Sequence, residues 1–359
     1  MRSLLKGQLS FMGKYFEVIA VSSPDENFED MLKEQQCRGI AVKMSRKITP
    51  IQDLISLFRL IVLFIKEKPD IVHTHTPKAG TLGMIAAWLC RVPCRIHTVA
   101  GLPLLVAAGK KRKLLDVVEK ITYRCATKVY PNSFVQKDMI ERLKFTKTSK
   151  LKVLANGSSN GINTQHFNPS HFTKNEDRVF RFVFIGRMVG DKGINELAQA
   201  FTRLNAIYPE TELVLVGNFE EKLDPLKSET KEILDNHKAI NFVGYQSDVR
   251  PFLAMSDAFV FPSYREGFPN VVMQAGAMGL PQIVTNINGC NEIIVEGENG
   301  VIIPSKDEEA LYAAMQRFVT SPDEVSKMAI NARDMITSRY EQAIVWDAIL
   351  SEYKLLLGQ

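Results

Sequence analysis

Short apolar runs alternate with amphipathic stretches along the whole chain. In the first half, runs rich in β-branched and aromatic residues predict strands over 17–22, 40–44, 70–74, 95–99, 128–131 and 151–154. Apolar positions three and four residues apart predict helices over 25–36, 51–66, 79–90, 111–125 and 134–143. Strands and helices that take turns in this way indicate parallel sheets covered by helices on both faces.

The second half of the chain repeats this alternation. Its predicted strands are 180–185, 212–216, 241–243, 258–261, 282–284 and 301–303, and its predicted helices are 194–208, 249–255, 271–278 and 308–320. The polar segment 168–177 between the two series is the expected linker. We therefore expect an α/β protein with two Rossmann-like, doubly wound domains, 1–172 and 173–339, facing an interdomain cleft. A C-terminal helix over 340–359 is expected to return to the first domain.

The start of the chain departs from this scheme. A doubly wound domain normally opens with a buried strand, but residues 1–16 have a helical pattern and the first strand follows at 17–22. Two interpretations stay open. Either the central strand is missing from this chain, or the start codon lies upstream of Met1.

Composition limits the class of protein. The 359 residues exceed what one hydrophobic core usually serves, and 45% hydrophobic with 24% charged residues excludes a disordered or fibrous chain. The longest apolar stretch, 54–65, contains Arg59 and is too short to cross a bilayer, and no secretion signal is evident at the start. The five cysteines show no metal-ligand spacing. We expect a cytoplasmic protein with free thiols.

Charge is distributed unevenly between the two halves. Residues 1–172 contain 27 Lys and Arg against 13 Asp and Glu, a net charge of +14, whereas residues 173–359 have a net charge of −9. The densest basic run, which includes Lys110 and Lys111, follows the apolar segment 101–108. This combination favours contact with an anionic membrane surface, although a solvated helix start beside a buried loop would give the same pattern. No nucleic-acid-binding signature accompanies it.

A glycine turn after the strand 180–185 is the first candidate phosphate site. Gly186 and Arg187 are followed by Lys192 and Gly193, where a strand-to-helix turn presents backbone amides and a positive helix end. The two cations suit a diphosphate, and the spacing is not that of a Walker loop. The alternative is an ordinary glycine turn with two surface cations.

A second candidate site follows the strand 258–261. Pro269 and Gly279 predict a helix that begins near Pro269 or Asn270 and ends at Gly279. Glu266 then lies in the preceding loop, and Gln274 lies about one turn inside the helix. An acid, free amides and a polar side chain in this order suit a sugar hydroxyl, a diphosphate and a ribose diol. The alternative is a helix with an ordinary polar cap.

Other candidate residues carry weaker signals. His73 and His75 end one predicted strand, His97 lies in the next, and Lys78 begins a helix. Each histidine is more often structural than catalytic. The chain contains no Asp-x-Asp pair of the kind that holds a divalent metal on a leaving diphosphate, so we expect no metal and no cofactor.

These motifs together resemble the retaining glycosyltransferases of family 4. The resemblance covers nearly the whole chain and rests on the two candidate sites, on 73–80, and on 289–292 and 298–300. It is closest to the branch that acts on polyprenyl-diphosphate-linked sugars in capsule, O-antigen or N-glycan assembly. It implies the GT-B architecture, two Rossmann-like domains with the sugar donor in the second.

The resemblance also implies roles for individual residues. Arg187 and Lys192 match the basic pair that binds the donor diphosphate, and Glu266 matches the first acid of a two-glutamate motif. The remaining donor-binding positions are Gly186, Gly267, Phe268, Pro269, Asn270 and Gln274. On the acceptor side the candidates are His75, Lys78, His97, Lys110 and Lys111.

Two positions depart from the family pattern. Gln274 replaces the second acid, so a charged hydrogen bond to the ribose becomes a neutral one. Ala100 stands where many relatives place a histidine before a glycine, here Gly101.

The sequence therefore predicts a metal-independent enzyme that moves a hexose or N-acetylhexosamine from a nucleotide-diphosphate sugar, UDP-linked by expectation, to a lipid-linked saccharide. Its basic first domain would hold it peripherally on the inner face of the membrane. Two alternatives stay open: a GT-B sugar-nucleotide epimerase or hydrolase, and a non-catalytic paralogue that binds the sugar nucleotide.

Overall fold

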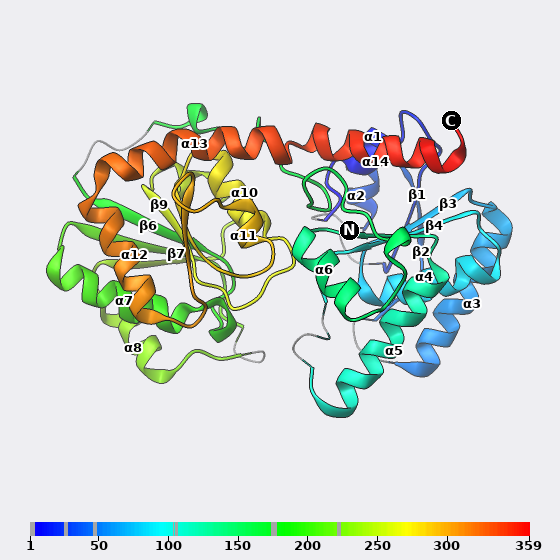
Figure 1. The fold of residues 1–359 in the computed structure, drawn as a ribbon, viewed down its shortest axis with the longest axis horizontal. Coiled ribbons are helices and arrows are strands. Elements are labelled where there is room, and N and C mark those ends of the chain that lie inside the picture. The colour runs from blue at the N-terminus through cyan, green and yellow to red at the C-terminus, as the bar shows by residue number, and fades with distance from the viewer. Residues whose placement is uncertain are drawn as a thin grey trace. The chain divides into compact units, whose positions relative to one another are not determined.

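The computed structural model describes residues 4–24, 28–45, 49–102, 104, 107–173, 178–220 and 224–359. The chain forms two compact units, one of Met1–Gly161 with Gln342–Gln359 and one of Ile162–Glu341 (Figure 1). The division between them falls after Gly161, earlier than the expected boundary at 172. Part of the expected linker, 174–177, lies outside the described residues.

The second unit is built on one parallel sheet of six strands in the order β11-β10-β9-β6-β7-β8. Its strands are β6 (Phe180–Ile185), β7 (Thr211–Val216), β8 (Ile240–Gly244), β9 (Ala258–Phe261), β10 (Gln282–Thr285) and β11 (Gly300–Ile303). The order reverses between β6 and β9, which pair through Phe182 with Ala258 and Val183 with Phe259. In open α/β sheets ligands bind beyond the carboxyl ends of the strands at such a reversal.

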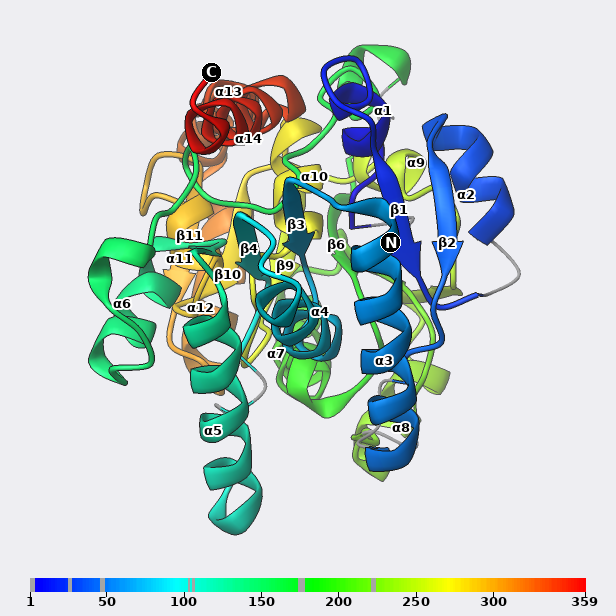
Figure 2. The same cartoon turned by 90° about the vertical axis from the view of Figure 1, so that its right-hand side faces the viewer.

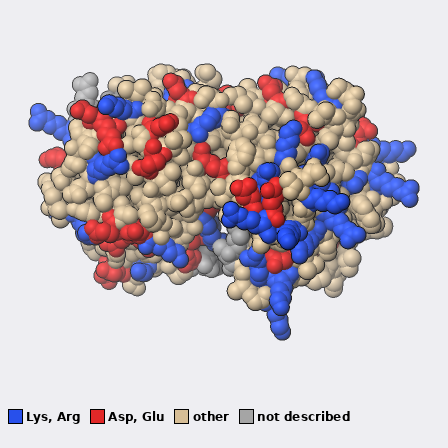
Figure 3. Space-filling view, in the orientation of Figure 1, with Lys and Arg blue, Asp and Glu red and all other residues tan. Residues whose placement is uncertain are grey.

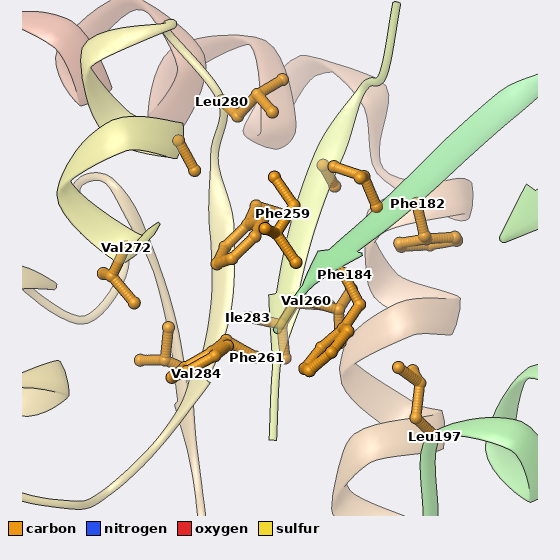
Figure 4. Close-up of a cluster of buried hydrophobic side chains, with 14 of the residues drawn as sticks. Phe182, Phe184, Leu197, Phe259, Val260, Phe261, Val272, Leu280, Ile283 and Val284 are labelled. Atoms are coloured by element: carbon orange, nitrogen blue, oxygen red, sulfur yellow. The ribbon is translucent and has the colours of Figure 1, made fainter. Parts of the chain in front are cut away.

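The strands at the reversal are buried on both faces and carry the core of this unit. Phe184 and Phe259 both stack on Phe261 with ring centroids 5.8 Å apart (Figure 4). The covering helices are α7 (Ile194–Ile207), α8 (Ser228–Asn236), α9 (Arg250–Ala254), α10 (Asn270–Ala277), α11 (Cys290–Ile293), α12 (Glu308–Thr320) and α13 (Pro322–Tyr340). The aromatic core fixes the two strands whose ends carry the candidate site.

The first unit contains two separate parallel sheets. β1 (Ile19–Ser22) pairs with β2 (Arg38–Ala41), and β3 (Ile71–Thr74) and β5 (Lys128–Pro131) flank β4 (Cys94–Val99). Its helices are α1 (Gln8–Met12), α2 (Phe28–Gln35), α3 (Pro50–Glu67), α4 (Pro77–Leu89), α5 (Gly109–Cys125), α6 (Phe134–Arg142) and α14 (Gln342–Leu357). Among the described residues no strand joins β1 to β3, where a continuous doubly wound sheet would have its central strand.

Helix α14 belongs to the first unit although it comes from the far end of the chain. Val345, Ile349 and Leu350 pack in one cluster with Ile96 and Tyr130 of the sheet. The Tyr130 hydroxyl donates to the buried carboxylate of Glu352 at 2.9 Å. The first unit is therefore closed by the last helix of the chain.

The α/β fold with parallel sheets is confirmed, and several predicted elements are corrected. The prediction of a strand over 151–154 is wrong: Leu151 forms only an isolated bridge with Val129, because Ala155 (φ 47°) and Gly157 (φ 96°) turn the chain. Of the helix expected over 1–16, residues 4–16, which the structure describes, form only α1. The pattern also missed α8, α11 and α13. No helix in the described part of the chain is long and apolar enough to cross a membrane.

Candidate active site

The first side of the site is the turn that follows β6. A short 3-10 helix, Gly190–Lys192, ends at Gly193, whose φ of 72° begins α7. A Cβ on Gly193 would lie 2.2 Å from the Pro262 carbonyl oxygen. Glycine is required here because the turn lies directly against the segment that follows β9, and this contact places Lys192 beside that segment.

Lys192 and Glu266 form an ion pair at the ends of β6 and β9. Both side chains are mostly buried, with 13% and 18% of their surface exposed. The Ser263 hydroxyl, itself fully buried, also donates to Oε1 of Glu266 at 3.1 Å. The Lys192 ammonium lies 5.6 Å from the centre of the Phe261 ring. Two of the predicted catalytic residues therefore meet, and each holds the other in place.

Arg187, the third predicted catalytic residue, pairs with a different acid. Its guanidinium donates to Glu220 at 3.2 Å, and the two side chains are 45% and 41% exposed. Exposed ion pairs of this kind contribute at most about 1 kcal/mol. An anionic ligand could therefore draw Arg187 away from Glu220 at small cost.

Contacts that the sequence pattern did not predict lock the two turns together. The Asp191 carbonyl accepts from the Tyr264 amide at 2.8 Å, and the Asp191 carboxylate pairs with Arg265 at 2.6 Å. The Tyr264 hydroxyl donates to Glu196 of α7 at 2.7 Å, and burial beside this acid raises the pKa of Tyr264. The only local signal for these contacts in the sequence is the polar Ser263, which follows the apolar strand β9 after Pro262.

A third segment, which follows β10, covers the loop of Glu266. The Asn288 amide donates to the carbonyl of Gly267 and, at 3.3 Å, to that of Glu266. A Cβ on Gly289 (φ 80°) would lie 2.8 Å from the Gly267 carbonyl oxygen. Cys290 behind it is fully buried, which raises the pKa of its thiol. The loop of Glu266 is thus held by the turn after β6 on one side and by the segment after β10 on the other.

Helix α10 presents its amino end at the same place. Pro269 is its N-cap rather than its first residue, and no side chain caps it. The first amides of an α-helix have no carbonyl partner within the helix, so those of Asn270 and Val271 carry partial positive charge outward. Phe268 packs on Tyr340 of α13 with ring centroids 5.5 Å apart. Gln274 lies half-buried one turn further along the helix.

Of the histidines in the first unit, His73 and His97 are hydrogen-bonded to neighbouring hydroxyls, whereas the buried Nδ1 of His75 has no hydrogen-bond partner among the described residues. The rings of His73 and His75 lie 4.1 Å apart, and the two nitrogens of His73 contact the hydroxyls of Tyr353 at 2.5 Å and Thr98 at 2.7 Å. The His97 ring bonds the Thr74 hydroxyl at 2.8 Å. Burial lowers the pKa of His97 to about 4 and that of His75 to about 3, so both are neutral near pH 7.

The acceptor-side lysines differ in their surroundings. Lys78 pairs with Asp53 at 2.7 Å and so ties the start of α4 to α3. Lys110 and Lys111 are exposed in the first turn of α5. In the apolar segment before them, the described residues Leu102 and Leu104 are buried, so they are not available to a membrane. Pro103, Leu105 and Val106 lie outside the described residues.

No group of three or more potential metal ligands occurs within the described ranges. The described part of the site consists of cations, amides and acids that already have partners, which is a set of groups suited to phosphate oxygens and sugar hydroxyls.

Comparisons with known proteins identify the family of the chain. Residues 167–335 match the family model of group 1 glycosyl transferases, and residues 13–157 match a glycosyl transferase 4-like domain. The capsular polysaccharide biosynthesis glycosyltransferase CapM of Staphylococcus aureus is 33% identical over 99% of this chain and 94% of its own. An Escherichia coli UDP-Gal:α-D-GlcNAc-diphosphoundecaprenol α-1,3-galactosyltransferase is 29% identical over 90% and 85% of the two chains.

Solved structures show the same fold. HepE of Anabaena, crystallised with UDP, superposes with a TM-score of 0.79 over 96% of this chain and 94% of its own, at 16% identity. A glycosyltransferase of Rickettsia africae has the same TM-score over 98% and 93% of the chains, at 20% identity. With these matches the resemblance seen in the sequence is confirmed, and the chain belongs to the family 4 glycosyltransferases and has their GT-B fold.

Proposed function

We propose that the chain transfers a hexose or N-acetylhexosamine from a UDP-linked donor to a polyprenyl-diphosphate-linked saccharide in the assembly of a surface polysaccharide. The single observation that carries this proposal is the Lys192–Glu266 pair beside the uncapped start of α10. The relatives in S. aureus and E. coli support the choice of pathway and acceptor, because their names describe capsule synthesis and a diphosphoundecaprenol-linked substrate.

The donor diphosphate is proposed to bind where cations and amides converge. The phosphate oxygens accept hydrogen bonds from the first amides of α10 and displace the Glu266 carboxylate from Lys192. Arg187 leaves its exposed partner Glu220 and joins Lys192 on the diphosphate. Glu266 then accepts a hydrogen bond from a hydroxyl of the sugar, and Gln274 bonds the ribose diol. Lys192, Arg187 and Glu266 thus each exchange a protein partner for a group of the donor, and the exposed Glu220 is left to solvent.

The proposed reaction is a substitution on one face of the sugar with retention of configuration. The bond from the anomeric carbon to the diphosphate oxygen breaks, and a bond from that carbon to the acceptor oxygen forms. The acceptor hydroxyl gives its proton to the departing diphosphate. Lys192 and Arg187 stabilise the negative charge that develops on the leaving group, which needs no metal in this scheme.

A transfer assay with UDP-linked sugars and diphosphoundecaprenol-linked acceptors in detergent tests the proposal. We expect Lys192→Ala and Glu266→Ala to reduce kcat by about 100-fold or more, as for other residues that stabilise a developing charge. Arg203→Ala removes an exposed cation on α7, bonded to Glu309, and serves as the matched control. Unchanged turnover in both site variants would contradict the proposal.

The same assay separates the alternatives. Consumption of the donor without acceptor would indicate an epimerase or hydrolase, and UDP binding without any turnover would indicate a non-catalytic paralogue. Addition of EDTA tests the absence of a metal step, since we expect it to leave the rate unchanged.

A further inference from the structure

Helix α3 of the first unit carries a row of large apolar side chains on its exposed side. Ile51 is 78% exposed, and Leu54 and Phe58 are each 66% exposed. The complete row, named here the α3 row, consists of Ile51, Leu54, Ile55, Phe58, Val62 and Ile65. These positions are three or four residues apart, so they line one face along most of the helix.

The opposite face of α3 already supplies the core. Leu60, Leu63 and Phe64 are buried against the rest of the first unit. A helix that faces water on its outer side normally carries polar residues there, and contiguous apolar surface of this kind marks an interaction site. The α3 row therefore needs a partner outside this unit.

The charges of α3 favour an anionic partner. Its two acids are already paired, Asp53 with Lys78 at 2.7 Å and Glu67 with Arg38 at 2.5 Å. Both cations of α3 are exposed: Arg59 lies in the middle of the helix and Lys66 near its end. The outer face of α3 thus combines apolar side chains with positive charge.

Helix α5 has the same character. Leu114, Val117 and Ile121 are 48%, 53% and 42% exposed. Exposed cations alternate with them along the helix, namely Lys110, Lys111, Lys113, Lys120 and Arg124. Its one exposed-side acid, Asp116, pairs with Arg112 at 2.8 Å, while Glu119 is buried.

The two helices belong to one layer. Helix α4 packs against both α3 and α5, and Figure 2 shows the three running side by side. At the end of α4, Trp88 and Leu89 are 54% and 51% exposed. Lys and Arg side chains gather around α5 in the space-filling view (Figure 3).

We infer that the exposed faces of α3 and α5 rest on an anionic phospholipid bilayer, with the α3 row at the acyl boundary and the surrounding cations at the lipid phosphates. This inference rests on the proposed function in one respect, because a lipid-linked acceptor lies in a membrane. It assigns the contact to α3 and α5, in place of the segment 101–108, of which Leu102 and Leu104 are buried.

Charge favours a bilayer over a second copy of the chain. In a twofold interface the same surface faces itself, so Lys113 and Lys120 of one copy would approach the same basic surface of the other. Like charges across an interface are unfavourable, whereas anionic lipid headgroups complement all of these cations at once.

Binding to vesicles tests the inference directly. We expect the full chain to sediment with vesicles of phosphatidylglycerol and phosphatidylethanolamine, and to bind phosphatidylcholine vesicles at least tenfold more weakly. The triple variant Leu54→Ser/Phe58→Ser/Val62→Ser should lose at least about tenfold in affinity. Lys113→Gln/Lys120→Gln should lose about 25-fold, roughly fivefold per cation. Ile330→Ser, at a 73% exposed position of α13, is the matched control.

A second variant keeps the test valid if the serine variants fail to fold. Phe58→Trp should show a blue-shifted emission and quenching by brominated lipid upon vesicle binding, and Ile330→Trp should show neither. Wild-type affinity for vesicles in the serine variants, or no quenching of Phe58→Trp, would overturn the inference. So would a dimer in solution that the triple variant dissociates, because a second copy would then cover the α3 row.

The outcome is separable from that of the proposed function. UDP affinity, measured by calorimetry, reports on the second unit, and transfer to acceptor in detergent reports on catalysis without a bilayer. If the chain does not bind vesicles but binds UDP and transfers sugar in detergent, only the membrane inference is contradicted. If it binds vesicles but neither binds UDP nor transfers sugar, only the proposed function is contradicted.

Discussion

Lys192 and Glu266 illustrate what single residues contribute to the candidate site. Each is mostly buried, and a buried charge without a partner is strongly destabilising, so the pair keeps both side chains in position. The sequence could place both after strands, because strand-to-helix turns have local signals. It could not reveal Ser263 or Asn288, because their hydrogen bonds depend on which strands are neighbours in the sheet.

Gln274 offers a test of ribose recognition. Gln274→Glu should tighten UDP binding about fivefold, because a hydrogen bond to a charged acceptor is worth roughly 1 kcal/mol more than a neutral one. Gln274→Ala should weaken binding by a similar factor. Isothermal titration calorimetry with UDP measures both. Equal affinity in all three proteins would show that position 274 does not contact the nucleotide.

Burial of His97 should make the stability of the first unit fall at acidic pH. Its pKa is about 4 in the folded protein because of burial, and about 6.5 in the unfolded chain, so the unfolded state takes up the proton first. The free energy of unfolding should therefore fall as pH drops below 6.5, by about 2 kcal/mol from this residue between pH 6.5 and 5. In His97→Gln that part of the loss should be absent.

Urea titrations at pH 7.5 and 5 measure the difference. His171→Gln changes an exposed histidine and should retain the full wild-type loss. An identical acid sensitivity in His97→Gln and wild type would contradict the assignment.

Among the elements, those with a strong local period were predicted well and those without it were not. β6 was predicted with its observed bounds, and α6 differs by one residue at its end. The segment 151–154 is apolar enough for a strand, but the positive φ values that follow it end the pairing after one bridge. The strands of the first unit form two separate sheets, β1-β2 and β3-β4-β5. Which strands pair depends on contacts between distant segments, and the spacing of apolar residues does not encode those contacts.

The turn between β6 and α7 can be tested through its glycine. Gly193→Ala should lower the free energy of unfolding by about 3 kcal/mol or more, because a Cβ would meet the Pro262 carbonyl in addition to the strain of a positive φ. It should also weaken UDP binding by displacing Lys192. Gly279→Ala has a similar φ, 79°, but open space around its Cβ, and should cost only about 1–2 kcal/mol.

Denaturant unfolding and calorimetry with UDP are the measurements. If both glycine variants lose the same stability and bind UDP equally, the close approach of the two turns is not what positions Lys192.

At the scale of the whole molecule, the sequence shows the charge asymmetry and predicts the α/β class. The structure then shows which segments of the chain pack into the same core. The first unit combines residues from both ends of the chain, since α14 completes it. The expected helix over 340–359 begins where α13 ends and α14 starts. Apolar spacing alone could not show which apolar faces meet, because that depends on contacts between distant segments.

The core role of α14 can be measured on the full chain. Ile349→Ala should destabilise the first unit by about 2–5 kcal/mol, because Ile349 is buried in the cluster with Ile96 and Tyr130. Leu355→Ala, on the same helix but 67% exposed, should change stability by no more than about 0.5 kcal/mol. In differential scanning calorimetry, UDP should raise the transition of the second unit and leave that of the first in place.

Closure of the first unit by α14 also affects how the protein is made. A ribosome releases all of the segment 162–341 before residues 342–357 emerge, so the second unit can fold while the first still lacks a helix. Until then the nascent first unit leaves the faces of Ile96 and Tyr130 uncovered. The part of the protein that is translated first is thus the last to be completed, and it exposes apolar core surface for longest during synthesis.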